Sequence, residues 1–135
     1  MNKIIKQAFN LLQEGKFQEA ELQYRKILKA KPNLAIAHHN LGVVLKNIGN
    51  SDEAIISFKK AIELKPDYII AHYNLGITFN EIKKFGEAAE SFKNAITLKP
   101  DYIEAYNNLG SSLSQINKLE EAVLNFKKVT ELKPE

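Results

Sequence analysis

The feature of the sequence that most constrains its fold is a period of 34 residues. All four prolines of the chain follow this period, at Pro32, Pro66, Pro100 and Pro134. Three similar stretches that end in Asn-Leu-Gly follow it as well, at residues 37–42, 71–76 and 105–110. A fixed period of roughly 20–50 residues indicates stacked structural units, each of which buries its apolar face only against its neighbours. The 135 residues therefore predict a single array of four units, 1–34, 35–68, 69–102 and 103–135.

Each unit is expected to contain two amphipathic helices. In the second unit, Leu41, Leu45 and Ile48 follow one another at spacings of four and three residues, which places them on one face of a helix. A second helix follows in the same unit, where Ala54 and Phe58 lie four residues apart. The third and fourth units repeat both patterns, and the first unit follows them more loosely. The predicted fold class is all-α, with four helix-turn-helix units.

Small residues indicate where the helices end and where they approach each other. Gly15 and Gly49 lie where a first helix would end in the left-handed conformation; of the equivalent residues, Asn117 is a tolerable substitute and Lys83 a poorer one. Inside a helix, glycine costs about 1 kcal/mol relative to alanine, so its presence there indicates a close approach by another segment. The glycines of this kind are Gly42, Gly76 and Gly110, and the residues expected to face them are Ala54, Ala88 and Ala122.

These residues resemble the tetratricopeptide repeat family over the whole chain. The resemblance is carried by the Leu-Gly pair of the first helix, the Ala-x-x-x-Phe of the second helix and the proline that ends each unit. The first unit departs from it, with Gln7-Ala8 in place of Leu-Gly, as expected for a terminal unit with one face toward water. The resemblance implies a right-handed superhelix in which the first helices line a concave groove.

In the geometry that the resemblance implies, one asparagine of each of the last three units points into the groove, namely Asn40, Asn74 and Asn108. An asparagine amide offers both a donor and an acceptor, as a peptide backbone does. The pattern is similar to the asparagine ladder in the repeat region of O-linked N-acetylglucosamine transferases. The first unit has Lys6 at this position. The alternative is that asparagine is simply tolerated on an exposed helix face.

Further candidate peptide-binding residues surround this ladder. An exposed strip of apolar and amide groups suits an extended peptide or a partner helix. For two of these residues, Val43 and Ile77, burial within or between the units is an equally good interpretation. The candidates are His39, Tyr73, Asn107, Ile36, Ile70, Val43 and Ile77.

A second ligand class of the resembled family, the carboxylate tails of chaperones, is not expected. The family's carboxylate clamp needs a lysine and an asparagine one turn apart, then an asparagine, then a lysine and an arginine. In either of the two possible alignments, only the middle asparagine matches, as Asn40 or as Asn74.

Other function classes find little support in the composition. The net charge is only +3 and Arg25 is the sole arginine, which argues against nucleic-acid binding. The chain has no cysteine, and His38 and His72, one unit apart, would lie about 10 Å from each other, too far for one zinc ion. No catalytic motif is present. We therefore expect no enzyme activity, cofactor, metal or membrane insertion, and a cytoplasmic location.

The function predicted from the sequence is that of a protein–protein interaction module that binds an extended peptide or partner segment in its concave groove. One alternative is an assembly scaffold that self-associates through its terminal unit, because the apolar side of helix 120–132, with Val123, Leu124 and Leu132, is expected to lack a cover unless the natural chain continues. Another alternative is the substrate-docking arm of a larger enzyme such as a glycosyltransferase.

Overall fold

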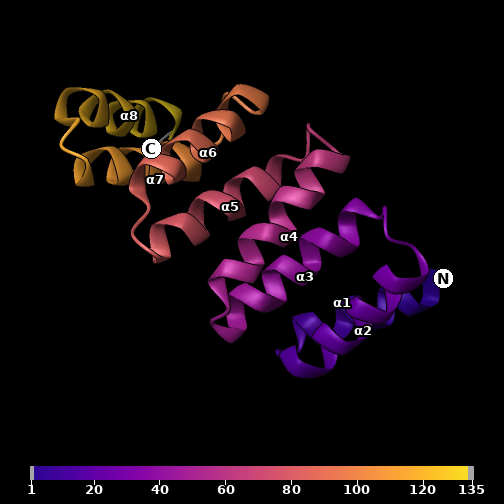
Figure 1. Cartoon of the computed structure of the whole chain (residues 1–135). Helices are drawn as coiled ribbons and strands as arrows, with labels where there is room; N and C mark the ends of the chain where they lie inside the picture. The colour runs from indigo at the N-terminus through magenta and orange to yellow at the C-terminus, as the bar shows by residue number, and fades with distance from the viewer. Residues whose placement is uncertain (1, 134–135) are drawn as a thin grey trace. The chain divides into compact units, whose positions relative to one another are not determined.

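The computed structural model describes residues 2–133, and every regular element in that range is an α-helix (Figure 1). The helices form four consecutive pairs, which confirms the all-α prediction of helix-turn-helix units. Their bounds are α1 Asn2–Gln13, α2 Phe17–Ala30, α3 Ala35–Ile48, α4 Ser51–Leu64, α5 Ile69–Glu81, α6 Phe85–Leu98, α7 Ile103–Gln115 and α8 Leu119–Leu132.

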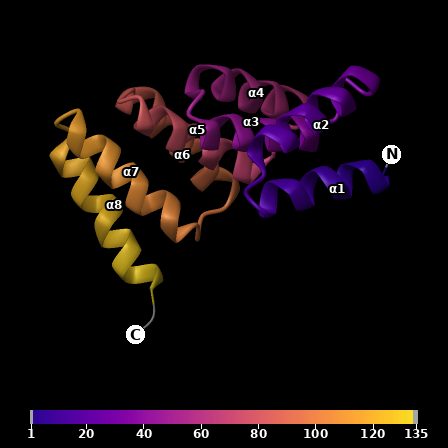
Figure 2. The same cartoon turned by 90° about the horizontal axis from the view of Figure 1, so that it is seen from below.

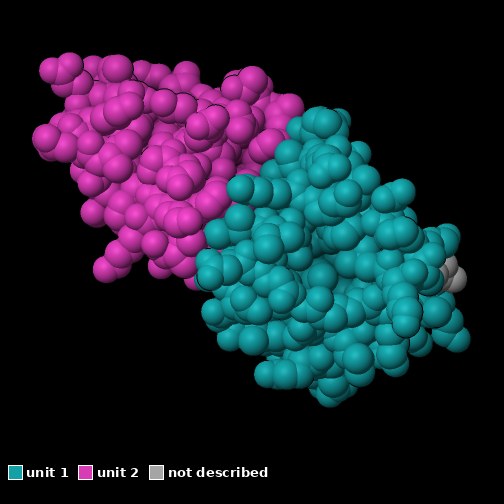
Figure 3. Space-filling view, viewed as in Figure 1, with its two compact units in different colours: residues 1–71 teal, residues 72–135 magenta. Residues whose placement is uncertain are grey.

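Residues 1–71 and 72–135 form two compact units (Figure 3). In the first unit, α1 packs against α2, α2 against α3, and α3 against α4. Most of α5 belongs to the second unit, where α6 packs against α7 and α7 against α8. Figures 1 and 2 both show α7 and α8 as an antiparallel pair joined by a short turn. The first helix of a pair and the second therefore pack directly on each other.

The first helix of each pair is followed by a residue in the left-handed conformation. Gly15 and Gly49 have φ angles of 75° and 96°, and the equivalent Lys83 and Asn117 have φ angles of 63° and 64°. Residues other than glycine adopt the left-handed conformation at a cost of roughly 1–2 kcal/mol, and asparagine is better tolerated there than lysine. The predicted helix ends are thus confirmed, and the turn after α5 holds its lysine in an unfavourable conformation.

We predict that Lys83→Gly stabilises the protein by about 1 kcal/mol, because glycine adopts the left-handed conformation without the steric cost of a Cβ atom. The shift of the urea midpoint measures this gain. Lys84→Gly is the matched control, because Lys84 has a φ of −92° that any residue adopts. An equal gain in both variants would contradict the proposed cause.

A phenylalanine ring of the second helix lies against the glycine inside the first helix. A Cβ atom added to Gly42, Gly76 or Gly110 would lie 2.7 Å from Cε1 of the ring opposite. The facing rings belong to Phe58, Phe92 and Phe126. The expectation that alanines face these glycines is therefore corrected. Ala54, Ala88 and Ala122 are buried in the core, and the phenylalanine one turn further along occupies the space that each glycine leaves.

A polar contact ties the start of a first helix to the preceding proline loop. The ring of His38 donates from Nε2 to the carbonyl oxygen of Pro32 at 2.8 Å. Tyr106, at the equivalent position two units later, donates from its hydroxyl to the carbonyl oxygen of Pro100, also at 2.8 Å. A carbonyl oxygen only accepts, so Nε2 of His38 carries the proton. These side chains orient the helices that carry the candidate site.

Candidate functional site

The first unit contains a cavity of about 370 Å³ between α1 and α3. Phe9 and Ile36 are exposed and form apolar walls on the two helices. Ile36 and Asn40 were both predicted as peptide-binding residues, and the structure places them in this one cavity. The residues that line it are Asn2, Ile5, Lys6, Phe9, Ile36 and Asn40.

The amide of Asn40 is held in one orientation by its neighbour. Nδ1 of His39 lies 3.1 Å from Oδ1 of Asn40, and an amide oxygen only accepts, so the imidazole donates. Burial lowers the pKa of His39, which keeps the ring neutral at pH 7 and the donor on Nδ1. The Asn40 side chain is only 5% exposed. Asn40 therefore offers a fixed amide at the edge of the cavity.

The His39 ring itself is buried among aromatic rings. Its centroid lies 5.6 Å from that of Phe58 and 5.0 Å from that of Tyr68. Nζ of Lys65 lies 4.9 Å from the Tyr68 centroid, which adds a cation–π contact. Tyr68 thus packs at a junction between helix pairs. His39 was predicted to contact a peptide directly. In the structure its ring contacts Asn40, Phe58 and Tyr68.

A buried tyrosine lies near the same amide. The Tyr24 hydroxyl has no hydrogen-bond partner among the described residues. Burial raises the pKa of Tyr24 to about 12, and the Asn40 side chain offsets part of that rise without reaching hydrogen-bond geometry. A hydroxyl in this position stays protonated at every physiological pH. Tyr24 therefore adds no charge to the surroundings of Asn40.

The second unit holds a different amide arrangement around Asn108. Its Nδ2 donates to the Tyr73 hydroxyl at 2.9 Å and to the carbonyl oxygen of Glu104 at 3.0 Å. Both amide hydrogens are thereby used, and among the described residues no donor reaches Oδ1. Asn108 is half-buried. Its free acceptor is therefore the atom that a ligand N–H group could reach.

Tyr73 is positioned for this contact by ring stacking. Its ring lies 4.9 Å from that of Tyr102 at an interplanar angle of 26°, and 5.7 Å from that of Phe92. Burial raises the pKa of Tyr73, with a further rise from the Glu104 carboxylate and a partial offset from Asn108. The neutral hydroxyl accepts from Asn108 at neutral pH. Tyr73, like His39, therefore holds an asparagine of the predicted ladder.

The remaining predicted residues lie at different depths. Ile70 and Asn107 are exposed, whereas Asn74, Val43 and Ile77 are half-buried. The backbone carbonyl of Asn74 accepts from the Thr78 hydroxyl at 2.7 Å. The structure thus groups Ile36 with Asn40 in the first unit and Tyr73 with Asn108 in the second.

Four cavity residues on α1 were not predicted as site residues. Each lies one period before a residue of α3, which pairs Asn2, Ile5, Lys6 and Phe9 with Ile36, His39, Asn40 and Val43. The 34-residue period therefore contained the signal that could have found them. It was hidden because the first unit replaces the Asn-Leu-Gly stretch with Lys6-Gln7-Ala8.

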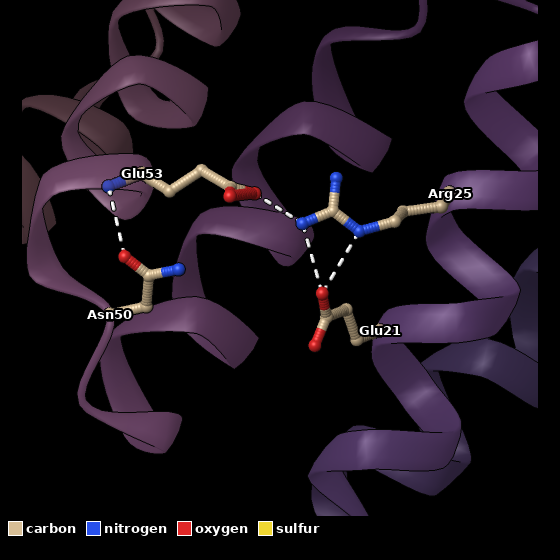
Figure 4. A network of polar contacts seen from close by, with 4 residues as sticks. All are labelled: Glu21, Arg25, Asn50 and Glu53. Atoms are coloured by element: carbon tan, nitrogen blue, oxygen red, sulfur yellow. Dashed lines mark hydrogen bonds and ion pairs between the residues drawn. The ribbon is translucent and has the colours of Figure 1, made fainter.

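The basic residues of the second helices are partly neutralised by carboxylates of the next pair. The Arg25 guanidinium lies between two carboxylates (Figure 4). Its Nε donates to Glu21 of the same helix at 2.9 Å, and the guanidinium forms an ion pair with Glu53 of α4. Lys93 and Glu121, two periods later, form the equivalent ion pair at 3.0 Å. Figure 4 also shows Asn50, whose side chain accepts from the Glu53 backbone N–H at 3.4 Å. Arg25 and Lys93 on the second helices are therefore engaged in ion pairs.

Within residues 2–133, no group of three or more histidine and acidic side chains is arranged to hold a metal ion. In the same range, no helix combines the length and the apolar character that crossing a membrane requires.

Comparison with protein families covers most of the chain. A family model described as TPR repeat matches residues 47–82 and 78–116. Two models described as tetratricopeptide repeat match residues 103–135 and 23–56. The chain belongs to the tetratricopeptide repeat (TPR) family. A sequence search against characterised proteins found no match.

Solved structures share the fold of this TPR protein. It is similar to the crystal structure of MamA, with a TM-score of 0.92 and 27% identity over 97% of this chain and 72% of that chain. For MamA from Desulfovibrio magneticus RS-1, residues 41 to the end, the TM-score is 0.89 and the identity 26% over 96% and 73% of the two chains. YrrB, described as a TPR protein with an unusual peptide-binding site, has a TM-score of 0.86 and 20% identity over 95% and 66%.

Proposed function

We propose that this TPR protein binds an extended peptide segment of a protein partner, and that the α1–α3 cavity takes an apolar side chain of that segment. The observation that carries the proposal is the combination of exposed Phe9 and Ile36 with the oriented amide of Asn40 in one cavity. Ligand sites typically join an apolar surface to a few fixed polar groups. The TPR family generally serves protein–protein interaction, and YrrB with the same fold has a peptide-binding site.

The peptide backbone would be held by asparagine amides, in a manner similar to the asparagine ladder of O-linked N-acetylglucosamine transferases. Asn108 supports this idea, because its two amide hydrogens are engaged and its Oδ1 can accept a backbone N–H. Asn74 is half-buried at the equivalent position one period earlier. At Lys6, the ammonium group would favour a carbonyl or carboxylate oxygen of the ligand. Each contact is compatible with many sequences, so side-chain preference would come from the apolar cavity.

A peptide-binding test uses dodecapeptides selected from a random display library against the folded chain. We expect Phe9→Ala and Ile36→Ala each to weaken the selected peptides about tenfold or more, because exposed apolar anchors in a cavity carry much of the binding energy. Asn108→Ala should weaken them through the loss of a backbone contact. Fluorescence anisotropy with a labelled peptide measures the dissociation constants.

Leu22→Ala is the matched control, since Leu22 is an exposed apolar residue of α2 that does not line the cavity. Circular dichroism confirms that each variant is folded. Unchanged affinity in Phe9→Ala and Ile36→Ala, or an equal loss in Leu22→Ala, would rule out the α1–α3 cavity as the peptide site.

A second candidate function is self-association through α8. Within residues 2–133, this helix carries a group of neighbouring exposed apolar side chains, namely Leu119, Val123 and Leu124. An exposed group of neighbouring apolar residues often marks a protein interface. Light scattering as a function of concentration tests for it, and a strict monomer up to about 1 mM, equivalent to a ceiling near −4 kcal/mol, would count against it.

A further inference from the structure

Phe126 differs from its equivalents in the preceding helix pairs. Tyr24, Phe58 and Phe92 lie one, two and three periods earlier, and all three are fully buried. Phe126 is 38% exposed although its ring makes the same contact with the glycine of its first helix. The contact inside the pair is therefore intact, and the exposed surface of Phe126 lies on the side of the ring away from that contact.

Val123 shows the same difference more strongly. It is 61% exposed, whereas its equivalents Ala89 and Ile55 are buried. The adjacent Leu124 is 64% exposed, but its equivalents Ile56 and Leu22 are exposed as well. An apolar residue at the position of Leu124 is thus exposed in each helix pair that has one there. At Val123, exposure marks a surface that the preceding pairs keep covered.

The uncovered residues form a seam along α8. Leu119, Val123, Phe126 and Thr130 follow one another at spacings of four, three and four residues. This is the spacing with which one helix packs against another in a coiled coil. We call these four residues the α8 seam. A seam of this kind fits a helix and not an extended peptide.

The opposite end of the chain is not a suitable cover for the α8 seam. Leu41 and Val44 are buried residues of α3, and their equivalents on α1 are the exposed Gln7 and Asn10. A second copy that docked its α1 on the seam would bury these polar side chains without apolar partners, which costs free energy. The α8 seam, by contrast, offers exposed apolar residues in helix-packing register to a second α8 seam.

We propose that the α8 seam packs antiparallel against the α8 seam of a second copy, around a two-fold axis near Val123 and Phe126. In this arrangement Val123 of one copy meets Phe126 of the other, and both sides are covered by one isologous contact. The inference rests on self-association, the second function proposed above, and names the surface through which it occurs.

Charge complementarity supports the antiparallel direction. Glu120 and Lys127 are exposed and flank the seam on one side, seven residues apart. Antiparallel alignment with Val123 opposite Phe126 brings Glu120 of one copy near Lys127 of the other, twice around the axis. In a parallel pair Glu120 of one copy and Lys127 of the other would lie on opposite sides of the seam, so this ion pair could not form.

Sedimentation equilibrium of the chain up to about 1 mM tests the proposal, with circular dichroism to confirm folding. We expect a monomer–dimer equilibrium in which Val123→Asp raises the dissociation constant at least about tenfold. Leu124→Asp, the adjacent and equally exposed control, should change it less than about threefold, because it lies outside the seam. Glu120→Lys and Lys127→Glu should each weaken the dimer, and the double variant should restore it to within about threefold.

The outcomes separate the two levels of the proposal. A wild-type chain that remains monomeric overturns both self-association and the α8 seam. A dimer that withstands Val123→Asp overturns the seam and leaves self-association standing. Equal losses of dimer affinity in Val123→Asp and Leu124→Asp would place the contact on the outer side of α8 and overturn the seam. A charge-reversed double variant that still dimerises weakly would overturn the antiparallel direction.

Discussion

Phe92→Ala is expected to destabilise the protein by about 3–5 kcal/mol, the range for removing a fully buried phenylalanine ring. Phe92 has no exposed surface and lies against both Gly76 and the ring of Tyr73. Its removal would leave a cavity, and the glycine that approaches the ring has no side chain with which to fill it. Urea denaturation followed by circular dichroism measures the loss.

Phe126→Ala is the matched comparison, since it removes the same ring from the same position of another helix pair. We expect less than half of the loss found for Phe92→Ala, because Phe126 is partly exposed and buries less apolar area. The comparison is made at a protein concentration at which the chain is monomeric. Equal losses in the two variants would show that the covering of the outer ring face contributes nothing to stability.

Gly76→Ala is expected to destabilise the protein by up to about 2 kcal/mol, although alanine is the better helix former. The added Cβ atom would lie 2.7 Å from Cε1 of Phe92, closer than van der Waals contact allows. Overpacking of this kind costs about 1–3 kcal/mol, which exceeds the gain in helix propensity of about 1 kcal/mol. Since Phe92 is fully buried, its ring has no free space into which it can move.

The same substitution at Gly110 should have the opposite or no effect. The distance from the added Cβ atom to Cε1 of Phe126 is again 2.7 Å, but Phe126 faces solvent on one side and its ring can swing outward. We expect Gly110→Ala to lie within about 0.5 kcal/mol of the wild type or to stabilise it through helix propensity. Urea midpoints of both variants decide the matter, and a destabilisation at Gly110 as large as at Gly76 would contradict the explanation.

The helical architecture could be predicted from the sequence because it depends on local spacing. Apolar residues three and four positions apart define one helical face, and the period places Gly49 and Lys83 at equivalent helix ends, which the structure confirms with left-handed φ angles at both. The partner of the helical glycines was predicted incorrectly. Alanine and phenylalanine lie on the same face of the second helix, and only the packed structure decides which of them fills the space.

The candidate site could be predicted only in part. The 34-residue period identified Asn40 and Asn108 as equivalent residues of their helices. It did not reveal that His39 donates to Asn40 while Tyr73 accepts from Asn108, one period further along the chain. The hydrogen bond engages Oδ1 in Asn40 but Nδ2 in Asn108, so that Asn108 retains a free acceptor. The two hydrogen bonds differ because His39 contacts the asparagine beside it, whereas Tyr73 contacts an asparagine of the following helix pair.

The sequence by itself determined the helix pairs, their ends and the equivalence of positions, because each of these follows from interactions within about one turn or from a repeated spacing. The tertiary structure alone decided how deeply each equivalent residue is buried. The sequence predicted an uncovered apolar side on helix 120–132, but it did not show that the Phe126 ring is partly exposed while the Phe92 ring is enclosed. Burial of a repeat residue depends on the side chains packed around it from other helices, and local spacing does not determine those contacts.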